Sequence, residues 1–93
     1  MPARNHDPEY AALIDHLVAA RRRQHLTQTD LAKRLERPQS YVSKVERLER
    51  RLDVGEWRAM AIAIGLDPAE AFAEICTLLD QMALLAPSPL RSR

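Results

Sequence analysis

Glycine, cysteine and aromatic residues are scarce in this 93-residue chain, and each shortage excludes a class of structure. With two glycines and no long alternating run of β-branched residues, helices are favoured throughout and a β-sheet is not expected. The single Cys76 cannot form an internal disulfide, which agrees with a reducing compartment. Aromatic residues make up only 4% of the chain, so it lacks the interleaved aromatics of RNA-binding platforms.

Membrane, secretory and catalytic signatures are also missing. No apolar run reaches about eighteen residues, so we expect no membrane span. The first ten residues lack the apolar core of a signal peptide, which predicts a cytoplasmic protein. The three histidines lie on separate segments without metal-site spacing to Cys76, and there is no glycine-rich phosphate loop or nucleophile elbow. We therefore expect no enzyme, metal, cofactor or small-molecule substrate.

The charge of the chain is unevenly distributed. Its length suits one domain with one modest core. Residues 21–58 hold 11 Lys or Arg against 6 Asp or Glu, whereas the remainder holds 3 against 7, and the net charge is +1. A basic excess in one segment is what a nucleic-acid face requires, although a charged run is more often only a solvated face.

Residues 26–46 form two short amphipathic segments with a break between them. Their apolar stripes have helical spacing and comprise Leu31, Ala32 and Leu35 in the first segment and Tyr41, Val42 and Val45 in the second. Thr27 is a plausible N-cap of the first segment. Pro38 cannot continue that segment but suits the first turn of the next one. Two helices of about two turns joined by three or four residues make a helix-turn-helix.

An ordered set of residues at this spacing carries a family resemblance: Leu26, Gln28, Leu31, Ala32, Leu35, Val42, Ser43, Val45 and Glu46. The stretch resembles the helix-turn-helix of the XRE family, the phage lambda repressor and Cro type. The likeness continues over residues 57–66, which look like the family's fourth helix and closing glycine turn. The resemblance covers roughly half the chain and implies an all-α, five-helix lambda-repressor-like DNA-binding domain.

Two residues depart from the family pattern. Glu36 stands in the turn where the family usually has glycine, and a non-glycine residue at positive φ costs about 1 kcal/mol. Pro38 stands where the family favours a Ser or Thr cap. The second helix of the pair, residues 39–46, corresponds to the recognition helix of the family. The second departure leaves the start of this helix open by one residue, and with it the direction of its first side chains.

Periodicity and capping patterns predict five helices. We expect them over residues 8–24, 28–35, 39–46, 54–64 and 68–85, in one domain spanning 8–86, with a flexible tail at 1–7 and a disordered tail at 87–93. Asp53 and Glu56 form a capping box that opens the fourth helix, and Gly65 ends it. Trp57 falls on the apolar stripe of that helix and is expected in the core.

The resemblance implies roles for polar residues in and around the helix-turn-helix. The expected base-reading residues are Gln39, Ser40, Ser43 and Lys44, and the expected phosphate-binding residues are Gln28, Arg47, Arg50 and Arg51. The chemistry fits, because Gln can bond adenine in bidentate fashion, Ser can donate to several base edges and Lys can reach guanine. Solvation alone would also make a short exposed helix polar. Tyr41 can stack in the core or offer its hydroxyl to a phosphate, and both remain open.

The resemblance also implies an ion pair between Arg21 and Glu46. A partly buried glutamate needs such a partner, and the pair would lock the first helix to the recognition helix. The simpler interpretation of the basic triplet at residues 21–23 is that cations in a last turn complement the helix dipole.

The expected helix at 68–85 carries two apolar stripes. One comprises Phe72, Ile75, Leu79, Met82 and Ala86, at alternating spacings of three and four, and the other comprises Leu78 and Leu85 beside Ala71. One stripe can pack on the body, so we expect the helix to extend the core and complete a C2 homodimer through Phe72, Ile75, Leu79 and Met82. One broad buried face in a monomer is the alternative.

The sequence thus predicts a sequence-specific regulator of transcription that binds double-stranded DNA, a homodimeric repressor acting on an inverted-repeat operator. A second hypothesis is an antitoxin-like or other helical interaction module that binds a partner protein through residues 68–85. The short chain leaves little room for an effector pocket, so control by protein level or by a partner protein is favoured over control by a metabolite.

Overall fold

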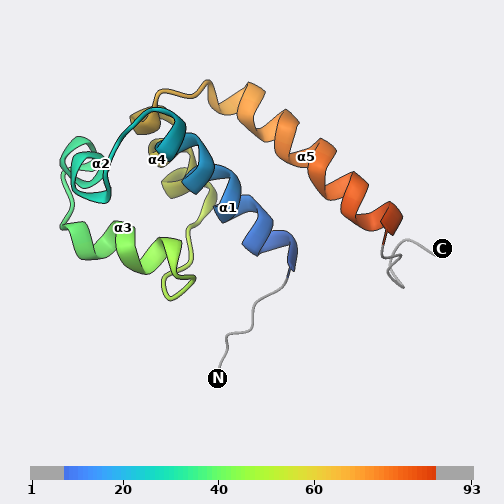
Figure 1. Cartoon of the computed structure of the whole chain (residues 1–93), viewed down its shortest axis with the longest axis horizontal. Helices are drawn as coiled ribbons and strands as arrows, with labels where there is room; N and C mark the ends of the chain where they lie inside the picture. The colour runs from blue at the N-terminus through green and yellow to red at the C-terminus, as the bar shows by residue number, and fades with distance from the viewer. Residues whose placement is uncertain (1–7, 86–93) are drawn as a thin grey trace.

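The computed structural model describes residues 8–85, and within that range it consists of α-helices without strands (Figure 1). The helices are α1 (Pro8–Arg23), α2 (Gln28–Leu35), α3 (Gln39–Glu46), α4 (Val54–Ile64) and α5 (Pro68–Leu85). These bounds agree with the expected ranges except that α1 ends one residue earlier. The expected tails at 1–7 and 87–93, and Ala86, lie outside the described residues.

All five helices contribute residues to the core. Its buried members are the apolar residues that recur every three or four positions: Tyr10, Ile14, Leu17, Ala20, Leu31, Ala32, Val42, Val45, Trp57, Met60, Ala61, Ile64, Ala71 and Ile75. Burying each large aliphatic side chain stabilises the fold by about 1.5–3 kcal/mol. Most of these residues belong to α1–α4, and only Ala71 and Ile75 come from α5.

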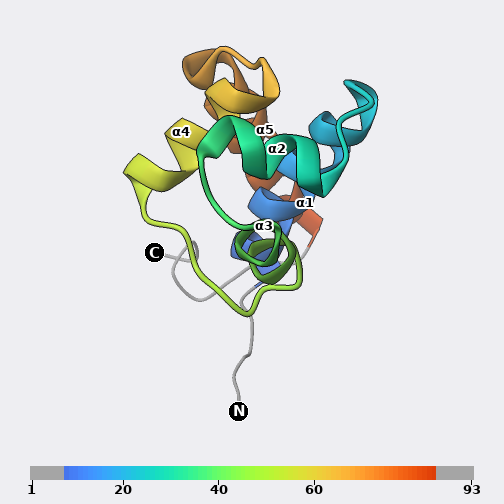
Figure 2. The same cartoon turned by 90° about the vertical axis from the view of Figure 1, so that its left-hand side faces the viewer.

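The arrangement separates α3 from α5. Figure 1 shows α3 on the left and α5 on the right, with α1 between them. Turned by 90° in Figure 2, the molecule presents α2, α3 and α4 towards the viewer with α5 behind. α3 and α5 therefore lie on different sides of the molecule.

Local backbone chemistry sets the helix ends. Thr27 caps α2 through a reciprocal pair of hydrogen bonds with Asp30, and Asp53 and Glu56 do the same for α4. Glu36 ends α2 in the left-handed region at φ 57°. This is the strained conformation expected for a non-glycine residue at a position where the family usually has glycine. Pro38 precedes α3 without a side-chain cap, so the first turn of α3 depends on tertiary contacts.

A polar contact joins α1 to α5. His16 Nε2 lies 3.0 Å from Glu74 Oε1, and the other ring nitrogen of His16 is buried without a hydrogen-bond partner among residues 8–85. None of the helices between residues 8 and 85 combines the length and the hydropathy needed to cross a bilayer.

Candidate nucleic-acid interface

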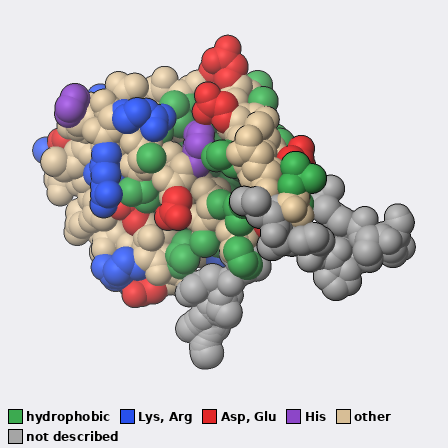
Figure 3. All heavy atoms as spheres, turned by 45° about the vertical axis from the view of Figure 1, so that its right-hand side comes forward, with side chains coloured by type: hydrophobic (Ala, Val, Ile, Leu, Met, Phe, Trp, Pro, Cys, Tyr) green, Lys and Arg blue, Asp and Glu red, His purple; other side chains and the backbone are tan. Residues whose placement is uncertain are grey.

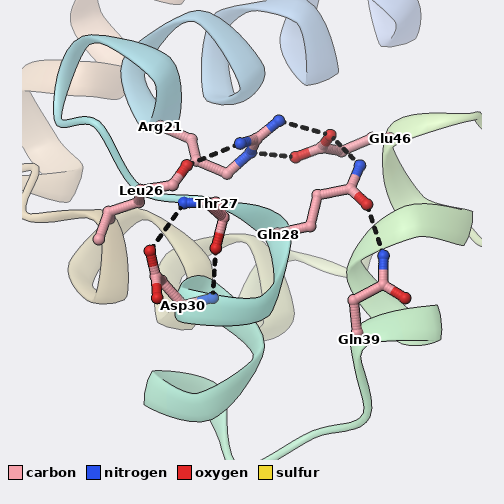
Figure 4. Close-up of polar contacts among 7 residues, drawn as sticks. All are labelled: Arg21, Leu26, Thr27, Gln28, Asp30, Gln39 and Glu46. Carbon is pink, nitrogen blue, oxygen red and sulfur yellow. Dashed lines mark hydrogen bonds and ion pairs between the residues drawn. The ribbon is translucent and has the colours of Figure 1, made fainter.

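A buried ion pair anchors the C-terminal end of α3. Arg21 donates from Nε to Glu46 Oε2 at 2.6 Å and from Nη2 to Glu46 Oε1 at 3.0 Å, and its Nη1 donates to the carbonyl of Leu26 at 2.7 Å (Figure 4). Both side chains are largely buried, with 8% and 11% exposed. The expected pair is therefore present, and it joins α1, the loop before α2, and α3.

The same carboxylate is the start of a line of side-chain amides. Gln28 Nε2 donates to Glu46 Oε1 at 2.8 Å, and Gln39 Nε2 donates to Gln28 Oε1 at 2.6 Å (Figure 4). Gln28 is thus a link between the ion pair and the first residue of α3, a role that sequence reasoning missed. Only three-dimensional proximity reveals it, because Gln28 and Gln39 lie on different helices.

This line of amides orients the Gln39 side chain. One N–H of Gln39 is used by Gln28, which leaves its carbonyl oxygen and its second N–H. An acceptor and a donor side by side are what the N6 and N7 edge of adenine requires. Gln39 is exposed, so this edge faces solvent rather than the core.

The other expected base readers also lie on the outer part of α3. Ser40 and Lys44 are exposed, and Ser43 is half-buried. The Ser43 hydroxyl accepts a hydrogen bond from Arg47 Nη1. The opposite face of α3 is fixed by Val42 and Val45, which are almost completely buried. The helix therefore carries its polar side chains on a rigid support.

The arginines that follow α3 all have partners within the chain. Arg47 donates to both carboxylate oxygens of Glu49, at 3.0 and 3.1 Å, and the hydrogen bonds raise the pKa of Arg47 above its ordinary value. The guanidinium of Arg51 lies 4.0 Å from the centre of the Tyr10 ring. The Tyr10 hydroxyl also accepts the backbone N–H of Leu52 at 3.1 Å, which ties this loop to α1.

Arg50 is held more firmly than the sequence suggested. Its Nη2 donates to Glu56 Oε2 at 2.8 Å and its Nη1 to the backbone carbonyl of Arg51 at 2.7 Å. The hydrogen bond from Arg50 holds the pKa of Glu56 below its ordinary value. Since Glu56 is part of the α4 capping box, Arg50 is tied to the start of α4.

Tyr41 lies at the edge of the core. It packs against the core from a half-buried site, and burial raises the pKa of its hydroxyl. The guanidinium groups of Arg37 and Arg50 lie over its ring, 4.5 and 5.1 Å from the ring centre. Sequence reasoning did not single out Arg37.

The structure corrects one member of the expected dimer interface. Ile75 is only 1% exposed and packs in the core of its own chain, so its side chain is not available to a second copy. Phe72 is 51% exposed and meets the Trp57 ring edge-on at 5.9 Å, while Leu79 and Met82 are half-buried. Leu78, assigned to the neighbouring stripe, is 43% exposed.

Surface chemistry differs across the molecule. In Figure 3, Lys and Arg side chains gather towards the left of the view, and hydrophobic side chains gather at the lower centre and right. Among the described residues, no group of three or more His, Cys, Asp or Glu side chains is placed to hold a metal ion.

Comparisons with known proteins agree with this geometry. A family model described as helix-turn-helix matches residues 17–70, more than half of the chain. Among solved structures, the chain is similar to an XRE-family like protein from Pseudomonas syringae pv. tomato str. DC3000, at 46% sequence identity and a TM-score of 0.73. That similarity covers 75% of this chain and 85% of that chain. No curated protein gives a significant match.

Proposed function

The chain belongs to the XRE family of helix-turn-helix proteins, which are DNA-binding regulators, and we propose that it is a homodimeric repressor that binds an inverted-repeat operator. One observation carries the proposal. The polar side chains of α3 face solvent on a helix whose end is held by the buried pair of Arg21 and Glu46. Such a rod can enter a major groove without reorganising, and its target would be chromosomal DNA in the cytoplasm.

Base recognition is proposed to rest on four residues of α3: Gln39, Ser40, Ser43 and Lys44. The orientation of Gln39 by Gln28 favours adenine. Lys44 is an exposed cation in the last turn of α3 and suits guanine O6 and N7. Gln28, Arg47 and Arg51 are proposed as phosphate contacts, which set the register of the protein on the duplex.

The dimer is proposed to form through exposed apolar residues of α5. Phe72, Leu78 and Leu84 are 51%, 43% and 81% exposed, and apolar side chains of this size on one helix favour a covering partner. A two-fold axis would place two copies of α3 in successive major grooves, about 34–36 Å apart. Leu79 and Met82, both half-buried, would border the contact.

The test compares Lys44→Ala with Lys33→Ala on the DNA upstream of the protein's own gene. Lys33 is the matched control because it is an exposed lysine of α2, outside the four residues of α3 that are proposed to read bases. Footprinting first locates the operator. Lys44→Ala should then weaken operator binding by about 1–3 kcal/mol and relax the preference at one base pair, whereas Lys33→Ala should leave that preference intact. Equal losses on operator and random duplex for Lys44→Ala would contradict base reading.

The exposed apolar residues of α5 also favour a second function, an antitoxin-like module whose α5 binds a partner protein. Size-exclusion chromatography with short duplex DNA separates the two. A DNA-binding dimer should elute earlier with duplex at low salt and return to its free position at high salt. A module without DNA binding should elute unchanged at every salt concentration.

A further inference from the structure

Resting on the proposed function, we propose that Arg37 is a contact to a DNA backbone phosphate, and that Arg50 positions the Tyr41 ring on which Arg37 lies instead of binding phosphate itself. The ligand is a phosphodiester oxygen beside the turn between α2 and α3. The three side chains form what we call the Tyr41 cluster: Arg37, Tyr41 and Arg50, together with the carboxylate of Glu56.

The main chain fixes the origin of the Arg37 side chain. Its N–H donates to the carbonyl of Ala32 at 3.0 Å and so closes the end of α2. Two residues later α3 begins with Gln39, the residue oriented by the line of amides. A phosphate bound by Arg37 would therefore lie beside the end of α3 that is proposed to read a base.

Within the Tyr41 cluster the charges are unequally satisfied. Glu56 receives hydrogen bonds from both terminal nitrogens of Arg50, at 2.8 and 3.4 Å. Asp53, the other nearby acid, accepts the N–H of Glu56 at 2.7 Å as the cap of α4. Arg37 is exposed, and its guanidinium makes no hydrogen bond or ion pair with any residue from 8 to 85.

A cation lying on an aromatic ring keeps its N–H groups free in the plane of the guanidinium. The ring restricts the side chain without using its donors, and Arg binds phosphate through such paired donors. Arg37 and Arg50 are no more than about 10 Å apart, since both lie over one ring. By neutralising Arg50, Glu56 reduces the repulsion that would drive Arg37 off the ring.

The cluster is tested by salt titration of binding to operator and to random duplex of equal length, using fluorescence anisotropy. Arg37→Ala should weaken both duplexes about tenfold and reduce the slope of log K against log salt by about 0.9 for each phosphate that is no longer neutralised. Lys33→Ala, which removes an exposed charge outside the cluster, should leave the slope unchanged.

A charge-balanced double variant distinguishes the role of Arg50 from that of Arg37. Gln at position 56 can keep the capping box, so the double variant Arg50→Ala with Glu56→Gln removes the ion pair without changing net charge. It should keep the wild-type salt slope, because the protein still neutralises the same phosphates. Tyr41→Leu, which removes the ring, should weaken both duplexes in the same direction as Arg37→Ala.

Two failures are distinguishable. If the wild-type protein prefers no DNA sequence, or binds none, the proposed function fails. If the wild type prefers its operator but Arg37→Ala retains the wild-type affinity and slope while the double variant lowers both, Arg50 is the phosphate contact and the inference is overturned.

Discussion

The two ends of the molecule are stabilised by different kinds of contact. At the α3 end, polar side chains are joined in a line from Arg21 through Glu46 and Gln28 to Gln39, at distances of 2.6–3.0 Å. At the α5 end, packing dominates: Ala71 and Ile75 enter the core while Phe72 and Leu78 stay exposed. Hydrogen bonds hold the polar side chains of the first end, whereas the second end exposes apolar side chains.

This difference fits two tasks. Reading bases requires donors and acceptors held in fixed directions, because hydrogen bonds lose strength when misaligned. Covering an apolar helix requires only surface of matching shape, since the hydrophobic effect is not directional. The comparison predicts that polar changes at the α3 end act together on the fold and on the proposed DNA contact, whereas changes at α5 act on the fold or on the proposed dimer.

The largest expected effect is from Glu46→Ala. It leaves Arg21 without its carboxylate partner in a nearly buried site, which should lower the free energy of unfolding by about 3–5 kcal/mol. Urea denaturation followed by circular dichroism measures the loss. The double variant Arg21→Met with Glu46→Leu should be more stable than Glu46→Ala, because no unpaired charge remains.

The same pair of variants sharpens the link to DNA. In the double variant Gln28 no longer has an acceptor on residue 46, so Gln39 is no longer oriented, and sequence preference should fall even where stability recovers. A double variant that is stable and retains full preference would show that the line of amides does not position Gln39.

The second prediction contrasts a buried and an exposed residue of α5, Ile75 and Leu78. Ile75→Ala should lower the free energy of unfolding by about 2–5 kcal/mol, because Ile75 is buried within one chain. Leu78→Ala should cost the isolated chain about 1 kcal/mol or less and should mainly weaken the proposed dimer. Sedimentation equilibrium and urea denaturation at two protein concentrations separate these effects, since only dimer stability depends on concentration.

The outcome for Leu78→Ala decides the interface. If the proposed dimer of this variant dissociates over the same concentration range as that of the wild type, Leu78 lies outside the interface. Ile75→Ala serves as the internal comparison because both changes remove aliphatic atoms from the same helix.

Sequence reasoning reached the helices for physical reasons and the ion pair by another route. Helix ends depend on local chemistry, such as Thr27 with Asp30 or the glycine at 65, and local chemistry is legible in the order of the residues. The pair of Arg21 and Glu46 came from the family resemblance. Packing direction was less accessible: helical spacing grouped Ile75 with Phe72, yet the body of the chain covers one and leaves the other exposed.

The contacts within the Tyr41 cluster were not accessible from sequence. Spacing gave no sign that Arg50 would meet Glu56, because that contact depends on how the loop after α3 folds back. The contact of Arg37 with Tyr41 is local, but it depends on the conformation of the turn before α3. The sequence located the basic excess in residues 21–58 but could not distinguish arginines paired within the chain from Arg37, whose guanidinium has no hydrogen-bond or ion-pair partner among residues 8–85.

The smallest expected effect concerns the turn that connects α2 to α3. Glu36 has φ 57°, where glycine is free of the strain that a side chain causes, so Glu36→Gly should stabilise the protein by up to about 1 kcal/mol. Thermal unfolding of the purified protein measures it. Leu48, at φ 66° in the loop after α3, is the matched comparison. Leu48 also packs against the core, so Leu48→Gly relieves similar strain but loses buried surface and should destabilise. If both variants were destabilised equally, the relief of backbone strain would not determine the effect of Glu36→Gly on stability.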